Sequence, residues 1–377
     1  MLNKIPLGIG GLTGLRTLSK VIIDGGNGFK ISELKGLSDL EGRLSIMGLD
    51  KVISPIQAED AKLLQKKGLD DLVMEWSDDF DDSRNHMTEF KVLEGLRPPP
   101  KLRELEILFY GGTIFPSWVG EPSFNQLTKL TLRGCRRCTH LPTLGHLRSL
   151  ETLHVEGMDG VKSLGLELLG PTDGIAFPSL EVLEISNMQG WERWSTRLDD
   201  NGGTCRSFPC LRAIWIIDCP KLVEVSIGLI PSLHDLRLEG CSAEVFKSMV
   251  SASSSIHELR LNDISCWSIE SYNCSNSVEL LDISYCDSLT SLTFSTMHEL
   301  PSSLETLHVD SCDNLESISE KGFGILPLES LWISNCKNLK LFPHEHLESL
   351  TSLKYMHIYI IVQVWTTHFL VGCGLQI

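Results

Sequence analysis

The stretch LTKLTLRGC, residues 127–135, has leucine at its first, fourth and sixth positions and cysteine at its ninth. Along an extended strand successive side chains point to opposite faces, so Leu130 and Leu132 share one face while Thr131 lies on the other. So short a strand can bury its apolar face only by stacking against further copies of itself. The stretch therefore favours a row of short parallel strands with a long core behind them.

The same spacing recurs along most of the chain, at intervals of about 20 to 30 residues, which is typical of leucine-rich repeats. The fourth and sixth positions are apolar in each copy, as in Leu236 with Leu238. We therefore predict an α/β leucine-rich-repeat solenoid, or horseshoe, with a parallel β-sheet on its concave face and loops and short helices on its convex side. The first position of each copy is filled by Leu102, Leu127, Leu150, Leu180, Leu211, Leu233, Ile256, Val278, Leu304, Leu328 and Leu353.

Cysteine is the commonest residue at the ninth position. Many repeat families place asparagine there to bond neighbouring backbones, so a small thiol predicts a packed turn and a buried, reduced cysteine. Single cysteines that recur at one place in a repeat also argue against a disulfide framework and favour a cytosolic protein. The residues at this position are Cys135, Cys219, Cys241, Cys286, Cys312 and Cys336, with Met158, Met188, Ile264 and Ile361 elsewhere.

Residues Cys135 and Cys138, with His140 and His146 after them, have a spacing that zinc sites also use. Cys135 already occupies the packed ninth position, however, and no second cysteine pair follows. We therefore expect no metal ion. The sequence also offers no ordered nucleophile and base, so we expect no catalytic residues and no enzyme activity.

The chain is predicted to have three parts. Residues 1–100 hold irregular N-terminal repeats, residues 101–357 hold the regular ones, and residues 358–377 form an atypical apolar tail. In the first part, Ser54 as N-cap, Pro55 at the first helical position and Gln57 as a capping-box residue predict one helix near residues 55–67. Polar residues and glycines interrupt the apolar tail, so we expect no membrane span.

The charge balance restricts the partners. The chain has 33 Lys and Arg against 49 Asp and Glu, a formal net charge of -16. Such a charge opposes attraction to nucleic acid and to anionic membrane surfaces. The N-terminus has no sustained apolar run, so a signal peptide and secretion are not expected. Binding of another protein is the remaining class.

Binding should lie on the face opposite the core, at the residue between the fourth and sixth positions. Neighbouring strands lie about 4.8 Å apart, so these residues form one column. Tryptophan and arginine dominate interface energetics, which favours Trp215, Arg237, Arg260 and Trp332 as contact residues. The alternative is that the two arginines only balance nearby carboxylates in a surface charge ladder. The column comprises Glu106, Thr131, His154, Glu184, Trp215, Arg237, Arg260, Asp282, His308, Trp332 and His357.

Several stretches resemble the repeat region of plant disease-resistance proteins of the coiled-coil, NB-ARC, leucine-rich-repeat class, from about residue 7 to about residue 356. The stretches that carry this resemblance are GGLTGLRTLSK (10–20), GRLSI (42–46), LVMEWS (72–77), VLEGLRP (92–98), YGGTIFPSW (110–118), LPTLG (141–145) and FPSLE (177–181).

The resemblance implies an intracellular immune receptor in the cytoplasm, or alternatively the nucleus. In such a receptor the repeats sense a pathogen effector, directly or through a host protein, and hold a nucleotide switch closed. The chain lacks the Gly-x-x-x-x-Gly-Lys-Ser/Thr loop that binds phosphate, so ADP or ATP is expected only on a nucleotide-binding domain outside it. The sequence is thus expected to be a fragment or a truncated product.

Other functions stay open. The same repeats could recruit substrate for a ubiquitin-ligase adaptor, because a fold does not fix a function. An extracellular receptor is disfavoured because neither a signal peptide nor paired capping cysteines are present.

Overall fold

The computed structural model describes residues 7–26, 28–81, 83–170, 175–196, 207–265, 277–292, 300–318, 323, 326–340, 347 and 350–359. The chain divides into two compact units, Met1–Leu211 and Arg212–Ile377, called unit 1 and unit 2 below. In each unit the short parallel strands predicted from the leucine spacing form one main sheet.

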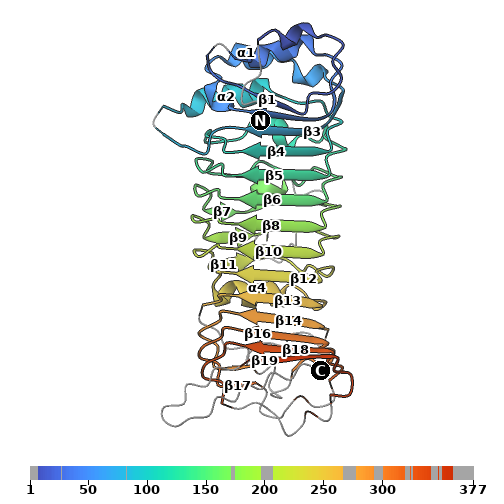
Figure 1. The fold of residues 1–377 in the computed structure, drawn as a ribbon, viewed down its shortest axis with the longest axis vertical. Coiled ribbons are helices and arrows are strands. Elements are labelled where there is room, and N and C mark those ends of the chain that lie inside the picture. The colour runs from blue at the N-terminus through green and yellow to red at the C-terminus, as the bar shows by residue number, and fades with distance from the viewer. Residues whose placement is uncertain are drawn as a thin grey trace. The chain divides into compact units, whose positions relative to one another are not determined.

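The main sheet of unit 1 is built from one strand per repeat, paired in parallel with the next (Figure 1). Leu105 pairs with Leu130, and Leu130 with Leu153, so equivalent positions of successive repeats lie side by side. The strands are β1 (Lys20–Ile22), β2 (Glu41–Met47), β3 (Gly68–Glu75), β4 (Glu104–Leu108), β5 (Lys129–Arg133), β6 (Thr152–Glu156) and β8 (Val182–Ser186).

Short helices and turns of unit 1 return the chain between strands (Figure 1). Asn85 caps the helix that follows it, α2 (His86–Gly95), by accepting hydrogen bonds from the backbone N–H groups of Met87 and Thr88. A second, smaller pairing joins β7 (Ser163–Leu164) to β9 (Arg193–Ser195). The helical segments are η1 (Ile9–Gly11), η2 (Ile31–Gly36), η3 (Leu49–Lys51), α1 (Pro55–Asp60), η4 (Leu63–Gln65), α2 (His86–Gly95), η5 (Ser117–Gly120) and α3 (Leu166–Leu169).

The helix expected over residues 55–67 is shorter than predicted. It begins at Pro55, as the sequence suggests, but α1 ends at Asp60. Lys62 adopts a left-handed backbone conformation with φ of 51°, which an α-helix cannot continue through, and a separate 3₁₀ turn follows. The side chain of Ser54 makes no capping hydrogen bond, so the predicted capping box does not form.

The main sheet of unit 2 repeats the same parallel pairing. Leu236 pairs with Leu259, and Leu307 with Leu331. Helix α4 (Ala243–Ser251) and strand β11 (Glu224–Ser226) lie in the returning segments, where β15 (Ser291–Leu292) also pairs with β17 (Ser317–Ile318). The main strands are β10 (Ala213–Ile217), β12 (Asp235–Glu239), β13 (Glu258–Asn262), β14 (Leu280–Ser284), β16 (Thr306–Asp310), β18 (Ser330–Ser334) and β19 (Tyr355–Tyr359).

The ninth-position cysteines are buried, as their place in the repeat predicts. The Cys135 thiol donates to the carbonyl oxygen of Ile107 at 3.7 Å, and the Cys241 thiol donates to that of Ile216 at 3.5 Å. Each acceptor belongs to the preceding strand. The thiol therefore packs in the core and also contacts the neighbouring backbone, the place where other repeat families use asparagine.

A left-handed residue ends the main strands from β4 to β18. Gly134, Gly157 and Gly240 fill this eighth position in three repeats, with φ between 58° and 66°. Side chains other than glycine fill it elsewhere, although they adopt this conformation at a cost. These residues are Phe109, Asn187, Asp218, Asp263, Tyr285, Ser311 and Asn335.

Some predicted features lie outside the described residues. They are Ile361 of the ninth position and residues 360–377 of the apolar tail. Within the described part of the chain, no helix is long and apolar enough to cross a membrane.

Candidate protein-binding face

The open face of each main sheet carries the residue between the two buried positions of every strand. In unit 1 four of the predicted column residues meet there through the strand register: Glu106, Thr131, His154 and Glu184. Arg43 lies 3.2 Å from Glu106, and His154 Nδ1 lies 3.1 Å from a carboxylate oxygen of Glu184. Most column charges in unit 1 are therefore paired within the sheet.

Strand ends in unit 1 add further charges to the same face. Arg133 lies 3.0 Å from Glu156 across β5 and β6. Burial raises the pKa of Glu75, and the nearby Lys20 ammonium opposes that effect. The open face of unit 1 thus carries a half-buried network of charges.

In unit 2 the first part of the column is also ion-paired. Trp215 Nε1 donates to Asp235 Oδ2 at 3.2 Å, and Arg260 Nη1 donates to Asp235 Oδ1 at 3.0 Å. Arg260 Nη2 donates to Glu258 at 2.5 Å. Burial raises the pKa of Asp235, against the opposing effects of the Trp215 hydrogen bond and the Arg260 charge. We call Trp215, Asp235, Arg237, Glu239, Glu258 and Arg260 the ion-paired set.

Arg237 belongs to this set through a 2.9 Å hydrogen bond to Glu239 on its own strand. Both arginines that the sequence favoured as contact residues therefore have carboxylate partners within the sheet. This geometry agrees with the charge-ladder alternative. A docking protein would have to compete with these partners, so the arginines offer less binding free energy than unpaired ones would.

The last part of the column in unit 2 is aromatic. The Trp332 and His357 rings stack with centroids 4.2 Å apart, and His308 meets Trp332 edge-on at 6.1 Å. Asp282 is the column residue before His308, and its Oδ1 atom lies 3.0 Å from His308 Nδ1. Tyr355 and Tyr359 flank His357 on β19, so we call His308, Trp332, Tyr355, His357 and Tyr359 the aromatic set.

The aromatic set is open to solvent. Trp332 is 46% exposed, Tyr355 is 69% exposed and Tyr359 is 56% exposed. The nearby Asp310 carboxylate accepts hydrogen bonds from Ser334, Ser311 and Asn335. Burial acts to raise the pKa of Asp310, but these hydrogen bonds outweigh it and lower the pKa. The surroundings of the tryptophan are thus fixed by hydrogen bonds while its ring stays accessible.

Tyr355 and Tyr359 were not predicted as binding residues from the sequence. The prediction covered only the residue between the fourth and sixth positions, whereas these tyrosines occupy the neighbouring outward positions of the same strand. The alternation rule could have found them if it had been applied to the full width of each strand.

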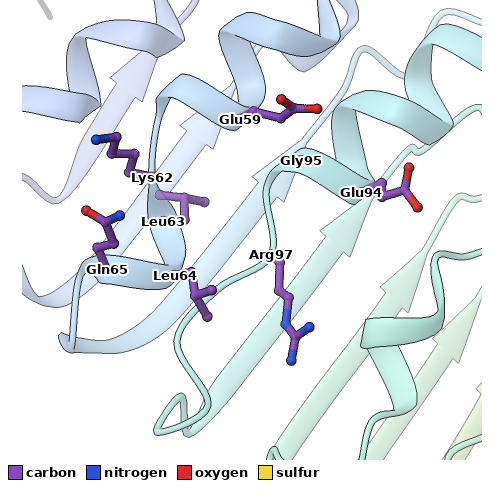
Figure 2. A pocket seen from close by; sticks show the side chains of 8 residues that line it. All are labelled: Glu59, Lys62, Leu63, Leu64, Gln65, Glu94, Gly95 and Arg97. Carbon is purple, nitrogen blue, oxygen red and sulfur yellow. The ribbon is translucent and has the colours of Figure 1, made fainter.

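A hollow of about 400 Å³ lies between η4 and α2 in unit 1 (Figure 2). It is lined by Glu59, Lys62, Leu64, Glu94 and Arg97 among others. Figure 2 shows the charged ends of these side chains diverging instead of meeting at one point. This arrangement gives no pair of groups for acid–base or nucleophilic chemistry.

The cysteines that suggested zinc have another role in the structure. Cys138 Sγ donates to the carbonyl oxygen of Gly112 at 3.2 Å, and both Cys135 and Cys138 are fully buried. Burial raises the pKa of Cys135 to about 12, which opposes the thiolate that a metal ion requires. The two thiols are core residues.

Comparison with known proteins finds one matching family model and several relatives of this chain. The family model described as R13L1/DRL21 LRRs matches residues 31–158. Disease resistance RPP13-like protein 1 of Arabidopsis thaliana is 32% identical over 85% of this chain and 29% of its own length. This chain is similar in sequence to the leucine-rich-repeat regions of plant disease-resistance proteins.

Two further relatives of this leucine-rich-repeat region come from Solanum bulbocastanum. Disease resistance protein RGA4 is 32% identical over 69% of this chain, and RGA1 is 31% identical over 80% of it. The chain spans less than a third of the length of these relatives, 26% of RGA4 and 29% of RGA1. Among solved structures, a leucine-rich repeat protein from Bacteroides ovatus is 15% identical to this chain, with a TM-score of 0.20. The match covers 90% of this chain and 84% of the Bacteroides chain.

Proposed function

We propose that this chain is the protein-recognition region of a plant immune receptor. Its partner would be a pathogen effector or a host protein that the receptor monitors, and it would dock on the open face of unit 2. The observation that carries the proposal is the exposed aromatic set around Trp332. Tryptophan and tyrosine supply a large contact area with few rotatable bonds, which makes them frequent anchors of protein interfaces.

The remaining parts of the proposal follow from the family. ADP or ATP would bind a nucleotide-binding domain that is not among these repeats, and the repeats would restrain that domain by contact. The receptor would act in the cytoplasm or the nucleus. This chain would contribute recognition without any catalytic step.

Exposure and pairing support an order among the candidate contact residues. Trp332 becomes the first, because its ring is exposed and its neighbours are aromatic. Trp215, Arg237 and Arg260 follow, because each one already has a carboxylate partner in the sheet. An ion pair at a solvated surface contributes on the order of 1 kcal/mol or less, so the ion-paired set would add specificity more than affinity.

Site-specific cross-linking tests the location of the partner. A photoreactive phenylalanine analogue replaces Tyr355 in one protein and Val223 in another, and both are expressed in pathogen-challenged plant tissue. Val223 is a matched control, because it is 55% exposed in the same unit but lies outside the open face. We expect a light-dependent adduct with an effector or a host protein from position 355 and none from position 223.

Two other outcomes of the cross-linking would point away from this proposal. An adduct made mainly with ubiquitin-ligase subunits or their substrates would support the adaptor alternative. Adducts from position 223 with none from position 355 would contradict docking on the open face.

A further inference from the structure

A second column of side chains runs along unit 2, at the residue that follows the first leucine-type position. His234, His257 and Glu279 occupy it in three consecutive repeats. The backbone N–H of His257 donates to the carbonyl oxygen of His234 at 2.8 Å, and that of Glu279 to His257 at 2.8 Å. The parallel hydrogen-bond ladder therefore holds the three residues in register.

The two imidazole rings are oriented in the same way. Their centroids lie 4.9 Å apart with 27° between the ring planes. His234 Nδ1 lies 2.6 Å from the carbonyl oxygen of Ser232, and His257 Nδ1 lies 2.7 Å from that of Ser255. A carbonyl oxygen can only accept, so in the neutral rings the proton resides on Nδ1 and Nε2 keeps its lone pair. This hydrogen bond is the one that usually orients a metal-binding histidine.

A carboxylate lies next to the pair. Glu279 Oε1 is 4.0 Å from His257 Nε2, which is too far for a hydrogen bond. The Glu279 side chain is 51% exposed, so it can change its rotamer at little cost. A zinc ion bound about 2.1 Å from each atom would bring the nitrogen and the oxygen closer than they are now.

The side chains do not yet surround an ion. Among the residues that the structure describes, no group of three histidine, cysteine or acidic side chains is arranged to hold one. Binding therefore requires the exposed Glu279 to turn towards His257 and the two Nε2 atoms to converge. These movements leave the backbone ladder unchanged, but the stacked rings must also tilt away from their present angle of 27°, which lengthens the Nδ1 hydrogen bonds to Ser232 and Ser255.

We propose that His234, His257 and Glu279 bind a divalent transition-metal ion of the zinc type. The ligands would be the two Nε2 atoms and one carboxylate oxygen. Two imidazoles and one carboxylate suit Zn²⁺ better than Mg²⁺ or Ca²⁺, which prefer oxygen ligands only. Three protein ligands leave a fourth position of the tetrahedron for water or for a group from a docked partner. The ion would also link three successive repeats.

Titration calorimetry of the whole chain with ZnCl₂ at pH 7.5 tests this site. We expect binding in the micromolar range that His234→Ala and His257→Ala each weaken at least tenfold. Glu279→Gln should weaken it by a smaller factor. His86→Ala is the control, because His86 is exposed at the start of α2 in unit 1 and lies outside both proposed sites, and it should leave this binding unchanged.

Electron paramagnetic resonance with Cu²⁺ as the probe gives a second readout, which should show two nitrogen ligands in the parent chain. Circular dichroism checks that the variants remain folded. Unchanged zinc affinity and stoichiometry in the His234→Ala/His257→Ala double variant would overturn the proposal. A copper spectrum with a single nitrogen ligand would also overturn it.

Discussion

The Arg84 guanidinium donates two hydrogen bonds of 2.8 Å to the Glu89 carboxylate, from Nε to Oε1 and from Nη2 to Oε2. Only 4% of the Arg84 side chain and 6% of the Glu89 side chain are exposed. Arg84 also donates to the carbonyl oxygens of Ser77 and Phe109, and Glu89 accepts from the N–H of Gly111. This pair therefore fixes the loop after β3 to α2 and to the end of β4.

Breaking this pair should destabilise unit 1 strongly. Glu89→Ala leaves a buried guanidinium without its carboxylate, so we expect a loss of about 3–5 kcal/mol in the free energy of unfolding. Arg97 and Glu121 form a matched, exposed pair, for which Glu121→Ala should cost about 1 kcal/mol or less. Urea unfolding of both variants checks the prediction, and equal losses would contradict it.

Lys66 should make the stability of unit 1 depend on pH. Its ammonium group is buried and donates to the carbonyl oxygens of Leu34 and Leu37. Burial lowers its pKa from 10.5 to about 8. Between these values the unfolded chain holds a proton that the folded chain has lost, so stability rises as the pH rises through this window.

The size of this effect follows from the shift, which corresponds to a gain of about 3 kcal/mol at most. The measurement is the difference in unfolding free energy between the parent and Lys66→Met at pH 7.5 and at pH 10. That difference should move in favour of the parent at pH 10. A difference that stays constant would show that Lys66 keeps its ordinary pKa in the folded protein.

Substitutions at the left-handed position that follows the main strands should change stability in opposite directions, depending on the residue that occupies it. Tyr285 adopts φ of 55° and is exposed, so Tyr285→Asn should stabilise unit 2 by on the order of 0.5–1 kcal/mol. Gly134→Ala should destabilise unit 1, because its added Cβ would lie 2.5 Å from the Phe109 ring and φ is 66°. Thermal unfolding measures both changes, and a Gly134→Ala variant as stable as the parent would refute the assignment.

The buried cysteines should resist alkylation. Burial raises the pKa of Cys135 and of Cys241 to about 12, whereas Cys210 is exposed. Iodoacetamide at pH 8 should modify Cys210 in the folded protein, and Cys135 and Cys241 only after unfolding, because the thiolate is the reactive form. Mass spectrometry of tryptic peptides reads the outcome. Rapid labelling of Cys241 in the folded chain would mean that the ninth position is not packed.

The strands could be predicted from the sequence because the pattern that produces them lies within a few neighbouring residues. Alternation within Leu-x-Leu determines which side chains are buried, and stacking of repeats determines the parallel pairing. The end of helix α1 was not predictable in this way, since its amphipathic pattern continues past Lys62, where the backbone turns left-handed. Leu64, which the predicted helix would have included, follows this turn and is exposed.

The sequence predicted the column of candidate binding residues, but it did not predict that the column divides into the ion-paired set and the aromatic set. Single positions cannot show that Arg260 reaches Asp235 on the neighbouring strand, or that Trp332 stacks on His357. The same limit hid His234, His257 and Glu279, because a search for metal ligands within one stretch does not compare equivalent positions of consecutive repeats.

The affinity of the partner found by cross-linking at position 355 shows which side chains of the open face bind it. It is titrated against the parent chain, Trp332→Ala and Arg237→Ala. We expect Trp332→Ala to weaken binding at least tenfold, because a tryptophan anchor contributes on the order of 2 kcal/mol or more, and Arg237→Ala to weaken it less than threefold. An affinity unchanged by Trp332→Ala would contradict the claim that the aromatic set of unit 2 is the recognition surface.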